Sequence, residues 1–258
     1  METYLLYNGK VKLNFDPIKH IYYMENEIIY GTTNIVGIIE KKGLIFWAVN
    51  QCIQNLKNIW KAGKSYDEIE INNILQSSKD IHKEKTDQAA MIGEYVHSWI
   101  EKYIKAKINN TELPKLPVNE KIINSVKAFL KWESENKVEW IDSEKKILSL
   151  KYKYAGTLDA EAIVNGELSI IDFKTSNGIW DEYLLQVSAY LKAREEETKQ
   201  DYKNVYIIRI GKDGELETKK VNDKELKDCF KAFLGCLEVY KWKMKRKGEE
   251  INKLKTNK

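Results

Sequence analysis

Apolar and polar residues alternate along the first forty positions of the chain, and this period of two predicts strands. Val11–Phe15 alternates strictly, as expected for a half-buried strand. Two further short apolar segments, His20–Tyr23 and Ile28–Tyr30, flank the turn-like residues Glu25–Glu27, which is typical of a β-hairpin. The N-terminal region is therefore expected to be built from strands.

Helical spacing replaces this alternation from about Leu44 onward. Apolar residues that recur at intervals of three and four predict four helices, over residues 44–61, from a capping-box pattern at Ser65–Glu68 onward, over 86–107 and over 119–136. A loop with two prolines, residues 113–117, separates the last two.

A period of two returns between residues 138 and 174. Three strands are predicted there, over 138–151, 154–164 and 167–174, and Asn165-Gly166 predicts a tight hairpin turn between the last two. A helix over 179–197, a strand pair over 205–211 and 215–221, and a last helix from about Asp223 follow. This order predicts an α/β fold: a central mixed sheet flanked by helices, with an N-terminal β-hairpin and a helical insertion.

Composition excludes several classes of protein. The chain has 258 residues, of which 43% are hydrophobic and 32% charged, as in ordinary globular proteins. No run reaches the roughly 18 apolar residues of a membrane span, and the first residues lack a signal-peptide pattern. The three cysteines lack a C-x-x-C pair, which argues against a disulfide framework, a zinc ribbon or a four-cysteine iron–sulfur cluster: they are Cys52, Cys229 and Cys236. We expect an intracellular, cytoplasmic protein.

Charge is unevenly spread along the chain. The net charge is +4, but residues 241–258 alone carry eight Lys and Arg against two Glu. The rest of the chain is therefore close to −2. A basic tail attracts polyanions, although a solvated helix end that fades into disorder explains it equally well.

Three charged residues on two neighbouring strands carry the candidate chemistry. Asp172 and Lys174 flank Phe173 on the strand over 167–174, so they share one face. The hairpin turn folds the preceding strand back alongside, and this brings Asp159 close to Asp172. Burying such charges without partners is costly, and two adjacent carboxylates repel each other and raise one pKa.

A divalent cation would compensate these carboxylates. Mg²⁺ and Mn²⁺ prefer oxygen ligands and bridge carboxylates to phosphates. A bound cation also activates water, while a neighbouring lysine orients that water and stabilises charge on a phosphate. A purely structural ion pair between Asp172 and Lys174 is the alternative, but it leaves Asp159 and the preceding Gly156-Thr157-Leu158 unexplained.

The spacing of these residues resembles the PD-(D/E)xK nuclease superfamily, and in particular its RecB-like branch. Gly156 to Asp159 matches the Gly-x-x-Asp lead-in of that branch, and Asp172 to Ser176 matches its Asp-x-Lys-Thr-Ser motif. Leu158 stands where the superfamily name has proline, as is usual in this branch. The resemblance implies a restriction-endonuclease-like core, a Mg²⁺ or Mn²⁺ cofactor and DNA as the partner. Asp159, Asp172 and Lys174 would be the catalytic residues.

Further motifs extend the resemblance. Gly93 and His97 match the helix motif of the branch, which implies that His97 is a metal ligand; taken alone, such a histidine is more often a packed core residue. Gln186 and Tyr190 match its Gln-x-x-x-Tyr motif and imply substrate contacts. Glu144 lies where related nucleases have an acid near the active centre, but an exposed strand glutamate explains it about equally well. The main-chain carbonyl of Phe173 is a further implied metal ligand.

We therefore predict one nuclease domain over residues 1–258. It comprises N-terminal strands (1–43), a helical portion with His97 (44–137), a catalytic sheet core (138–221), and a C-terminal helix with a basic tail (222–258). The first residues, from Asp16 to Trp47, resemble phage and mitochondrial exonucleases of the branch, which is compatible with a phage or prophage origin.

The leading hypothesis is a metal-dependent exonuclease that acts at single-stranded or duplex DNA ends in recombination, repair or replication. A non-catalytic DNA-end-binding module and a restriction-type endonuclease are the alternatives. Polarity, strand preference, DNA against RNA, oligomeric state, protein partners and pathway stay open.

Overall fold

The computed structural model describes residues 1–256, and side chains through residue 248. The basic tail predicted over 241–258 therefore lies partly outside the described residues. Within them the strands are β1 (Glu2–Leu6), β2 (Val11–Asp16), β3 (Ile21–Met24), β4 (Glu27–Gly31), β5 (Val138–Ser149), β6 (Tyr154–Val164), β7 (Glu167–Lys174), β8 (Asn204–Ile210) and β9 (Leu216–Lys220). The helices are α1 (Thr32–Val36), α2 (Lys42–Ile59), α3 (Glu68–Asn109), α4 (Glu120–Glu135), α5 (Asp181–Thr198) and α6 (Asp223–Thr256).

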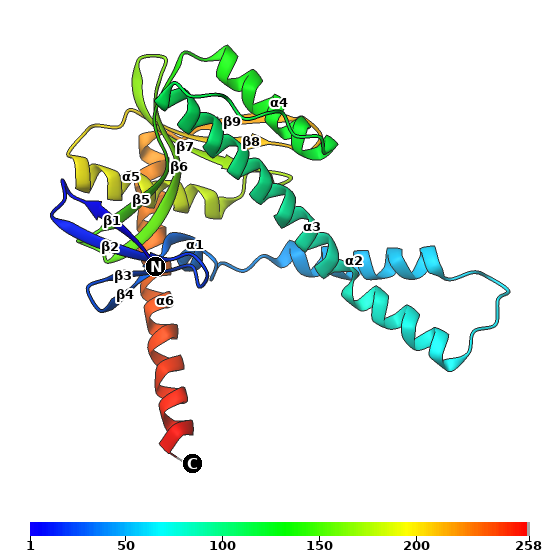
Figure 1. Cartoon of the computed structure of the whole chain (residues 1–258). Helices are drawn as coiled ribbons and strands as arrows, with labels where there is room; N and C mark the ends of the chain where they lie inside the picture. The colour runs from blue at the N-terminus through cyan, green and yellow to red at the C-terminus, as the bar shows by residue number, and fades with distance from the viewer. Residues whose placement is uncertain (257–258) are drawn as a thin grey trace. The chain divides into compact units, whose positions relative to one another are not determined.

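The strands form one mixed sheet. Their order is β1-β2-β3-β4-β6-β7-β8-β9, with β5 paired to β6 as well. The pairs β4–β6 and β7–β8 are parallel and the other pairs are antiparallel. Figure 1 shows this sheet with helices against it. The predicted α/β fold, a central mixed sheet flanked by helices, is confirmed.

Helices cover both faces of the C-terminal part of the sheet. On one face, α5 and α6 bury an apolar cluster that includes Val187, Phe233 and Val205 of β8. On the other face, Phe129 of α4 packs edge-on against Phe173 of β7, with ring centroids 5.5 Å apart. Because apolar side chains of β7 and β8 point to both faces, these strands are buried on both sides, as expected for parallel strands.

The β6–β7 hairpin has the bounds and the turn that the sequence predicts. Asn165 and Gly166 have φ values of 53° and 86°, the left-handed conformation that a two-residue type I′ turn requires. The turn fixes the register, in which Val164 pairs with Glu167 and Ala160 with Ile171. This register places the side chains of the paired residues, from Val164 to Ala160 on β6 and from Glu167 to Ile171 on β7.

Two of the predicted helices are one helix. Instead of separate helices before and after residue 86, α3 runs unbroken for 42 residues. Between Gln76 and Lys85 the apolar stripe is reduced to Ile81, but this segment contains neither glycine nor proline, so nothing in it ends the helix. The prediction of two helices was wrong because a gap in the apolar stripe does not mark the end of a helix.

The capping box of α3 also differs from the prediction. Glu70 N–H donates to Asp67 Oδ1 at 2.8 Å, and Asp67 N–H donates to Glu70 Oε2 at 3.2 Å. This reciprocal pair is the capping-box arrangement, two residues after the predicted pair at Ser65 and Glu68. An aspartate caps a helix as well as a serine does, so the sequence offered two candidates.

Two elements were not predicted. Strand β1 pairs antiparallel with β2 over five residues, and the short helix α1 follows β4 directly. Each is too short for its periodicity to stand out from the flanking residues.

The chain divides into two compact units. One comprises residues 1–39 and 96–258 and contains the whole sheet; the other, Glu40–Tyr95, contains α2 and the first part of α3. In the second unit, Asn55 Nδ2 donates to Ser78 Oγ at 3.1 Å, and the rings of Trp60 and Tyr66 stack 4.8 Å apart. That all residues act as one domain stays a prediction.

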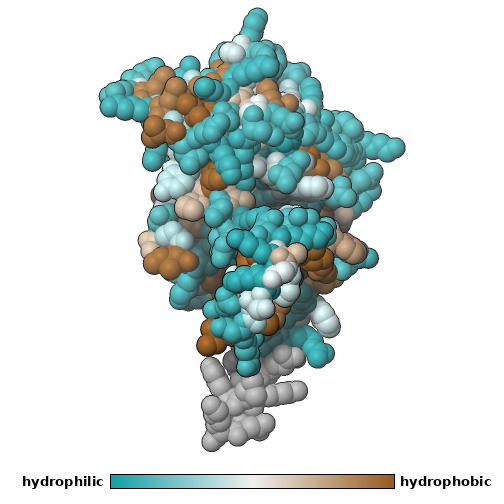
Figure 2. Space-filling model, turned by 90° about the vertical axis from the view of Figure 1, so that its right-hand side faces the viewer, coloured by the Kyte–Doolittle hydropathy of each residue, from teal (hydrophilic) through white to brown (hydrophobic). Residues whose placement is uncertain are grey.

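None of the helices among the described residues combines the length and the apolar character needed to cross a bilayer. Hydrophilic residues dominate the face drawn in Figure 2, with hydrophobic residues in small groups between them. Several apolar side chains of α2 are exposed: Leu44, Ile45, Phe46, Val49 and Ile53.

Candidate functional site

Three carboxylates lie across three adjacent strands of the sheet. The β5–β6 pairs on either side of Glu144 place it opposite Asp159. In the β6–β7 hairpin, the pairing of Ala160 with Ile171 places Asp159 beside Asp172. The hairpin therefore brings Asp159 next to Asp172, as the sequence predicts, and β5 adds Glu144 on the other side.

Helix α3 adds a histidine to these carboxylates. Val96, Ile100 and Ile104 are almost completely buried and anchor the last part of α3 in the core. His97 Nδ1 lies 3.6 Å from Asp159 Oδ2, and the two side chains are 30% and 15% exposed. The imidazole is thus the more exposed of the two side chains.

His97, Glu144 and Asp159 form a possible metal-binding group. One ligand atom from each lies within 4.8 Å of the ligand atoms of the other two. The group includes Glu144, the residue for which the sequence left two readings open. Asp172, which the sequence ranked above Glu144, is not one of its members.

Asp172 lies beside this group and is paired with Lys174. Its side chain is 1% exposed, and Lys174 Nζ lies 2.6 Å from Asp172 Oδ2. Neither carboxylate oxygen of Asp172 has a hydrogen bond of acceptable geometry. The Lys174 ammonium also lies over the ring of Tyr183, with Nζ 4.8 Å from the ring centroid, a cation–π distance.

An irregularity in β5 and β6 lies at the centre of the site. Glu144 has a φ of 56°, a left-handed conformation that is costly for a residue with a side chain. Across from it, alternation along β6 breaks: Leu158 belongs to the cluster packed on α5, and Glu161 also contacts α5 through Arg194. Residues three apart face opposite sides of a regular strand, so β6 departs from regular alternation between Leu158 and Glu161, although its pairing with β5 keeps one register from Asp142–Glu161 to Ser149–Tyr154.

Burial and mutual repulsion shift the pKa values of the acids upward. Burial, and then the charge of Asp159, raises the pKa of Glu144 to about 7. Burial also raises the pKa of Asp159 and raises that of Asp172 to about 6, although Lys174 opposes the latter shift. Ionising all three together is therefore unfavourable until a cation joins them.

The two basic groups shift in opposite directions. Burial, assisted by the charge of Lys174, lowers the pKa of His97 to about 4. The imidazole is thus neutral near pH 7 and able to act as a ligand. For Lys174, burial opposes the charged form, but Asp172 and Asp159 outweigh it and raise the pKa, so the ammonium keeps its proton.

The residues of this group fit a divalent cation. Asp172 is buried, and of its two oxygens only Oδ2 has a close partner, the Lys174 ammonium, so a further cation would compensate the remaining acceptor. The donor set of two or three carboxylates and one imidazole suits a hard or borderline ion such as Mg²⁺ or Mn²⁺. Phe173 contributes its N–H, which donates to Asp159 Oδ2 at 2.7 Å; the role of its carbonyl stays a prediction.

Helix α5 contributes the predicted pair Gln186 and Tyr190. Gln186 Nε2 donates to Tyr190 Oη at 2.5 Å and to Thr33 Oγ1 at 3.2 Å, so the two side chains hold each other. A Cβ placed on Gly156 would lie 2.9 Å from Tyr190 Cε1 and 2.7 Å from Thr32 Oγ1. Gly156 is therefore required for close packing here.

Sequence reasoning missed two tyrosines at the site. Tyr183 precedes Gln186 by three residues and Tyr190 by seven, so helical spacing could have identified it. Tyr22 Oη shares a hydrogen bond of 2.9 Å with Thr157 Oγ1, and burial raises the pKa of Tyr22 to about 12. Nothing local in the sequence identifies Tyr22, because β3 and β6 are far apart in the chain.

Comparison with known proteins gives weak structural likenesses. No family model and no curated protein matches the chain. Among solved structures, a protein from Eubacterium rectale described as a candidate exonuclease is 11% identical, with a TM-score of 0.40, over 58% of this chain and 66% of that one. The chain thus spans just under two thirds of that protein.

A second similar structure is an alkaline exonuclease from Laribacter hongkongensis. It is 14% identical, with a TM-score of 0.31, over 60% of this chain and 85% of that one. The same enzyme in complex with dAMP gives a TM-score of 0.29. Structural similarities this weak do not indicate an activity. The proposed function is therefore based on the residues of the site.

Proposed function

We propose that this protein is a Mg²⁺- or Mn²⁺-dependent deoxyribonuclease of the RecB-like branch of the PD-(D/E)xK superfamily. It would hydrolyse phosphodiester bonds as an exonuclease at DNA ends, in recombination, repair or replication. One observation carries the proposal: His97, Glu144 and Asp159 converge within 4.8 Å beside the buried pair of Asp172 and Lys174.

The metal ligands in this proposal are His97, Asp159 and Glu144, with Asp172 and the Phe173 carbonyl completing the set. A bound divalent ion would supply charge for the phosphate oxygens and a water of lowered pKa. Burial and the charge of Asp159 raise the pKa values of Glu144 and Asp172, so ionising all three acids is unfavourable without a cation. Their repulsion favours cation binding.

Lys174 has the second role in the proposal. Its ammonium is fixed by Asp172 on one side and by the Tyr183 ring on the other. A fixed donor of this kind can orient the attacking water and stabilise the charge that develops on the phosphate, with no reorganisation during the reaction. Its raised pKa keeps it protonated throughout.

Gln186 and Tyr190 are proposed to align the substrate. Their mutual hydrogen bond fixes both polar groups on the face of α5 that carries Tyr183. Rigid polar groups contribute to rate by holding a substrate in a reactive geometry.

One gel assay tests the proposal. End-labelled single-stranded DNA, duplex DNA, RNA and covalently closed circular DNA are incubated with Mg²⁺, with Mn²⁺ or with EDTA. We expect metal-dependent release of label from linear DNA, no cleavage in EDTA and no cleavage of closed circles. Lys174→Ala should lose this activity, and Lys231→Ala, which changes an exposed lysine on α6, is the matched control.

Other outcomes separate the alternatives. Cleavage of closed circles would indicate a restriction-type endonuclease. DNA binding in EDTA without cleavage after Mg²⁺ or Mn²⁺ is restored would indicate a non-catalytic end-binding module. Full metal-dependent activity of Lys174→Ala would contradict the proposed site itself.

A further inference from the structure

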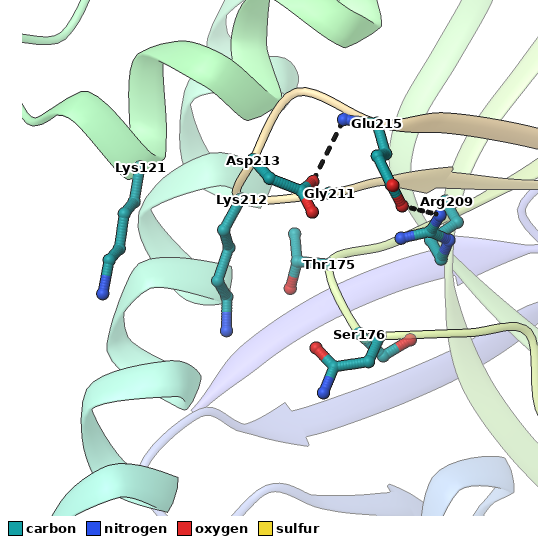
Figure 3. A pocket seen from close by; sticks show the side chains of 9 residues that line it. Lys121, Thr175, Ser176, Arg209, Gly211, Lys212, Asp213 and Glu215 are labelled. Atoms are coloured by element: carbon teal, nitrogen blue, oxygen red, sulfur yellow. Dashed lines mark hydrogen bonds and ion pairs between the residues drawn. The ribbon is translucent and has the colours of Figure 1, made fainter.

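A cavity of about 350 Å³ opens at the edge of the sheet, immediately after Lys174. Its wall begins with the loop that follows β7 and continues over the N-terminal end of α4 and the β8–β9 turn (Figure 3). The lining residues are Lys121, Thr175, Ser176, Asn177, Arg209, Gly211, Lys212, Asp213 and Glu215. This is the carboxyl end of the parallel pair β7–β8, an edge at which α/β sheets commonly bind ligands.

Two lysines of this cavity have no ion pair among the residues that the structure describes. Lys121 comes from α4 and Lys212 from the β8–β9 turn, and Figure 3 shows both side chains extending in the same direction, with Lys212 between Lys121 and Thr175. Burial, and then the charge of Lys121, lowers the pKa of Lys212. The two ammonium groups therefore lie close enough to repel, and an anion between them would relieve that repulsion.

The other charged residues of the cavity are already engaged. Arg209 Nη2 donates to Glu215 Oε2 at 2.8 Å, and its Nε donates to Glu217 Oε2 at 2.9 Å. Asp213 Oδ1 accepts the N–H of Glu215 at 3.0 Å. Asp213 has no ion pair among the described residues, so the lining carries Lys121, Lys212 and Arg209 against Asp213 and Glu215, a net charge of +1.

The walls of the cavity are fixed to each other. Ser125 Oγ of α4 donates to the carbonyl of Gly211 at 3.0 Å, which holds the β8–β9 turn against the helix. Thr175 adds a hydroxyl directly after Lys174, whereas the Ser176 hydroxyl already donates to the Gly178 carbonyl at 2.8 Å.

We propose that this cavity, here called the Lys121–Lys212 pocket, binds a phosphate group of the nucleic acid strand next to the phosphate that is cleaved. This inference rests on the proposed function. In register, Arg209 pairs with Lys174 on the neighbouring strand, so the pocket adjoins the reacting centre without sharing its carboxylates. The pocket would hold the strand in place, and Lys121 and Lys212 would be positioning residues.

The test compares the double variant Lys121→Gln/Lys212→Gln with wild type. Glutamine keeps most of the side-chain length and removes both charges. We expect KM for linear DNA to rise about 10-fold while kcat changes less than about 3-fold, the pattern of lost uniform binding. The slope of log affinity against log salt, measured by anisotropy in the Asp159→Asn background, should fall by about 0.7 for each lost contact on single-stranded DNA.

A matched control and a second probe keep the outcomes separate. Lys224→Gln/Lys227→Gln removes two exposed lysines of α6 and should leave KM and the salt slope unchanged. Inorganic phosphate should raise the melting temperature of wild type and not that of the Lys121→Gln/Lys212→Gln variant. This probe requires no nuclease activity.

The source of the phosphate is distinguished by end chemistry. Oligonucleotides with 5′-phosphate, 3′-phosphate or hydroxyl ends are compared. If only one phosphorylated end gains affinity in wild type and loses it in the double variant, the pocket binds a terminal phosphate. If the double variant has a lower affinity for all the oligonucleotides by the same factor, the pocket binds an internal phosphate.

Failure of this inference and failure of the proposed function give different results. Normal cleavage by wild type with an unchanged KM, salt slope and phosphate response in the double variant would overturn the pocket alone. Absence of cleavage in wild type, with DNA and phosphate binding still dependent on the two lysines, would overturn the nuclease function and retain the pocket.

Discussion

Strand β6 carries two carboxylates that lie two residues apart and have opposite surroundings. Glu161 is 2% exposed, and its oxygens accept hydrogen bonds from Arg194 Nη2 at 2.8 Å and Tyr202 Oη at 2.5 Å. Asp159 has His97, Glu144 and Asp172 as neighbours, and burial raises its pKa. One acid is compensated within the fold, whereas the other lies among acids that a single lysine does not balance.

The difference distinguishes Glu161, whose charge is compensated inside the fold, from Asp159, whose charge is available to a ligand. A buried acid with an arginine and a hydroxyl as partners has no remaining need for a ligand. A buried group of acids with unsatisfied oxygens is destabilising unless a cation binds. The contrast predicts that substitutions at the two positions act in opposite ways on stability and activity.

The largest effect is expected from Asp159→Asn. Cleavage should fall at least about 1,000-fold, since the variant removes a central metal ligand. The melting temperature without metal should stay the same or rise, because the asparagine oxygen can still accept the Phe173 N–H and one repelling charge is gone. Gel assays and thermal denaturation in EDTA measure the two quantities. Residual activity within about 10-fold of wild type would show that cleavage does not depend on Asp159 as a metal ligand.

Glu161→Gln should act on stability instead. It leaves the guanidinium of Arg194 with less compensation in the core, and breaking a buried pair costs about 3 kcal/mol. The free energy of unfolding should fall by this amount in urea, while cleavage per folded molecule stays within about 3-fold of wild type. Loss of cleavage without loss of stability would show that Glu161 belongs to the active site after all.

Metal binding gives a third, smaller contrast. At a Mn²⁺ concentration about 100 times the dissociation constant, wild type should gain about 2.7 kcal/mol of stability. Glu161→Gln should keep this gain, and Asp159→Asn should lose most of it. The measurement is thermal denaturation with Mn²⁺ against EDTA. An equal gain in all three proteins would indicate that the ion binds elsewhere.

The smallest effect is expected from truncation after Tyr240, which touches neither acid. The α6 residues that pack in the core, Phe230, Phe233 and Leu237, precede the cut, while Trp242 is exposed. Cleavage at saturating DNA should change less than about 3-fold, while affinity for DNA should fall most at low salt and depend less steeply on salt, because basic contacts are lost. A folded truncation product without activity would assign the tail a role in the reaction.

The sequence predicted the part of the site that depends on neighbouring residues. The Asn165-Gly166 turn and the alternation on its two sides fix the register of one hairpin, and this register alone brings Asp159 to Asp172. Gln186 and Tyr190 lie one helical turn apart, so their contact is local as well. Turn chemistry and periodicity act over a few residues, which is why these predictions could be made.

The prediction that His97 is a metal ligand depended on the resemblance to a nuclease family. An imidazole on an apolar helix stripe has no local feature that distinguishes a ligand from a packed core residue. The same limit explains the errors in α3, where the apolar stripe ends and resumes while the backbone stays helical. An apolar stripe indicates where other elements pack against a helix, and it does not indicate where the helical backbone begins or ends.

By itself, the sequence determined the strand and helix order, the hairpin and the carboxylate–lysine pair on β7. Only the tertiary structure decided that Glu144, on β5 with a left-handed backbone, joins His97 and Asp159, and that Arg194 satisfies Glu161 instead. It also decided that Lys121 and Lys212 line one pocket beside Lys174. The physical reason is that the free energy of a buried charge depends on which partners the packed fold brings to it, and those partners come from distant segments of the chain.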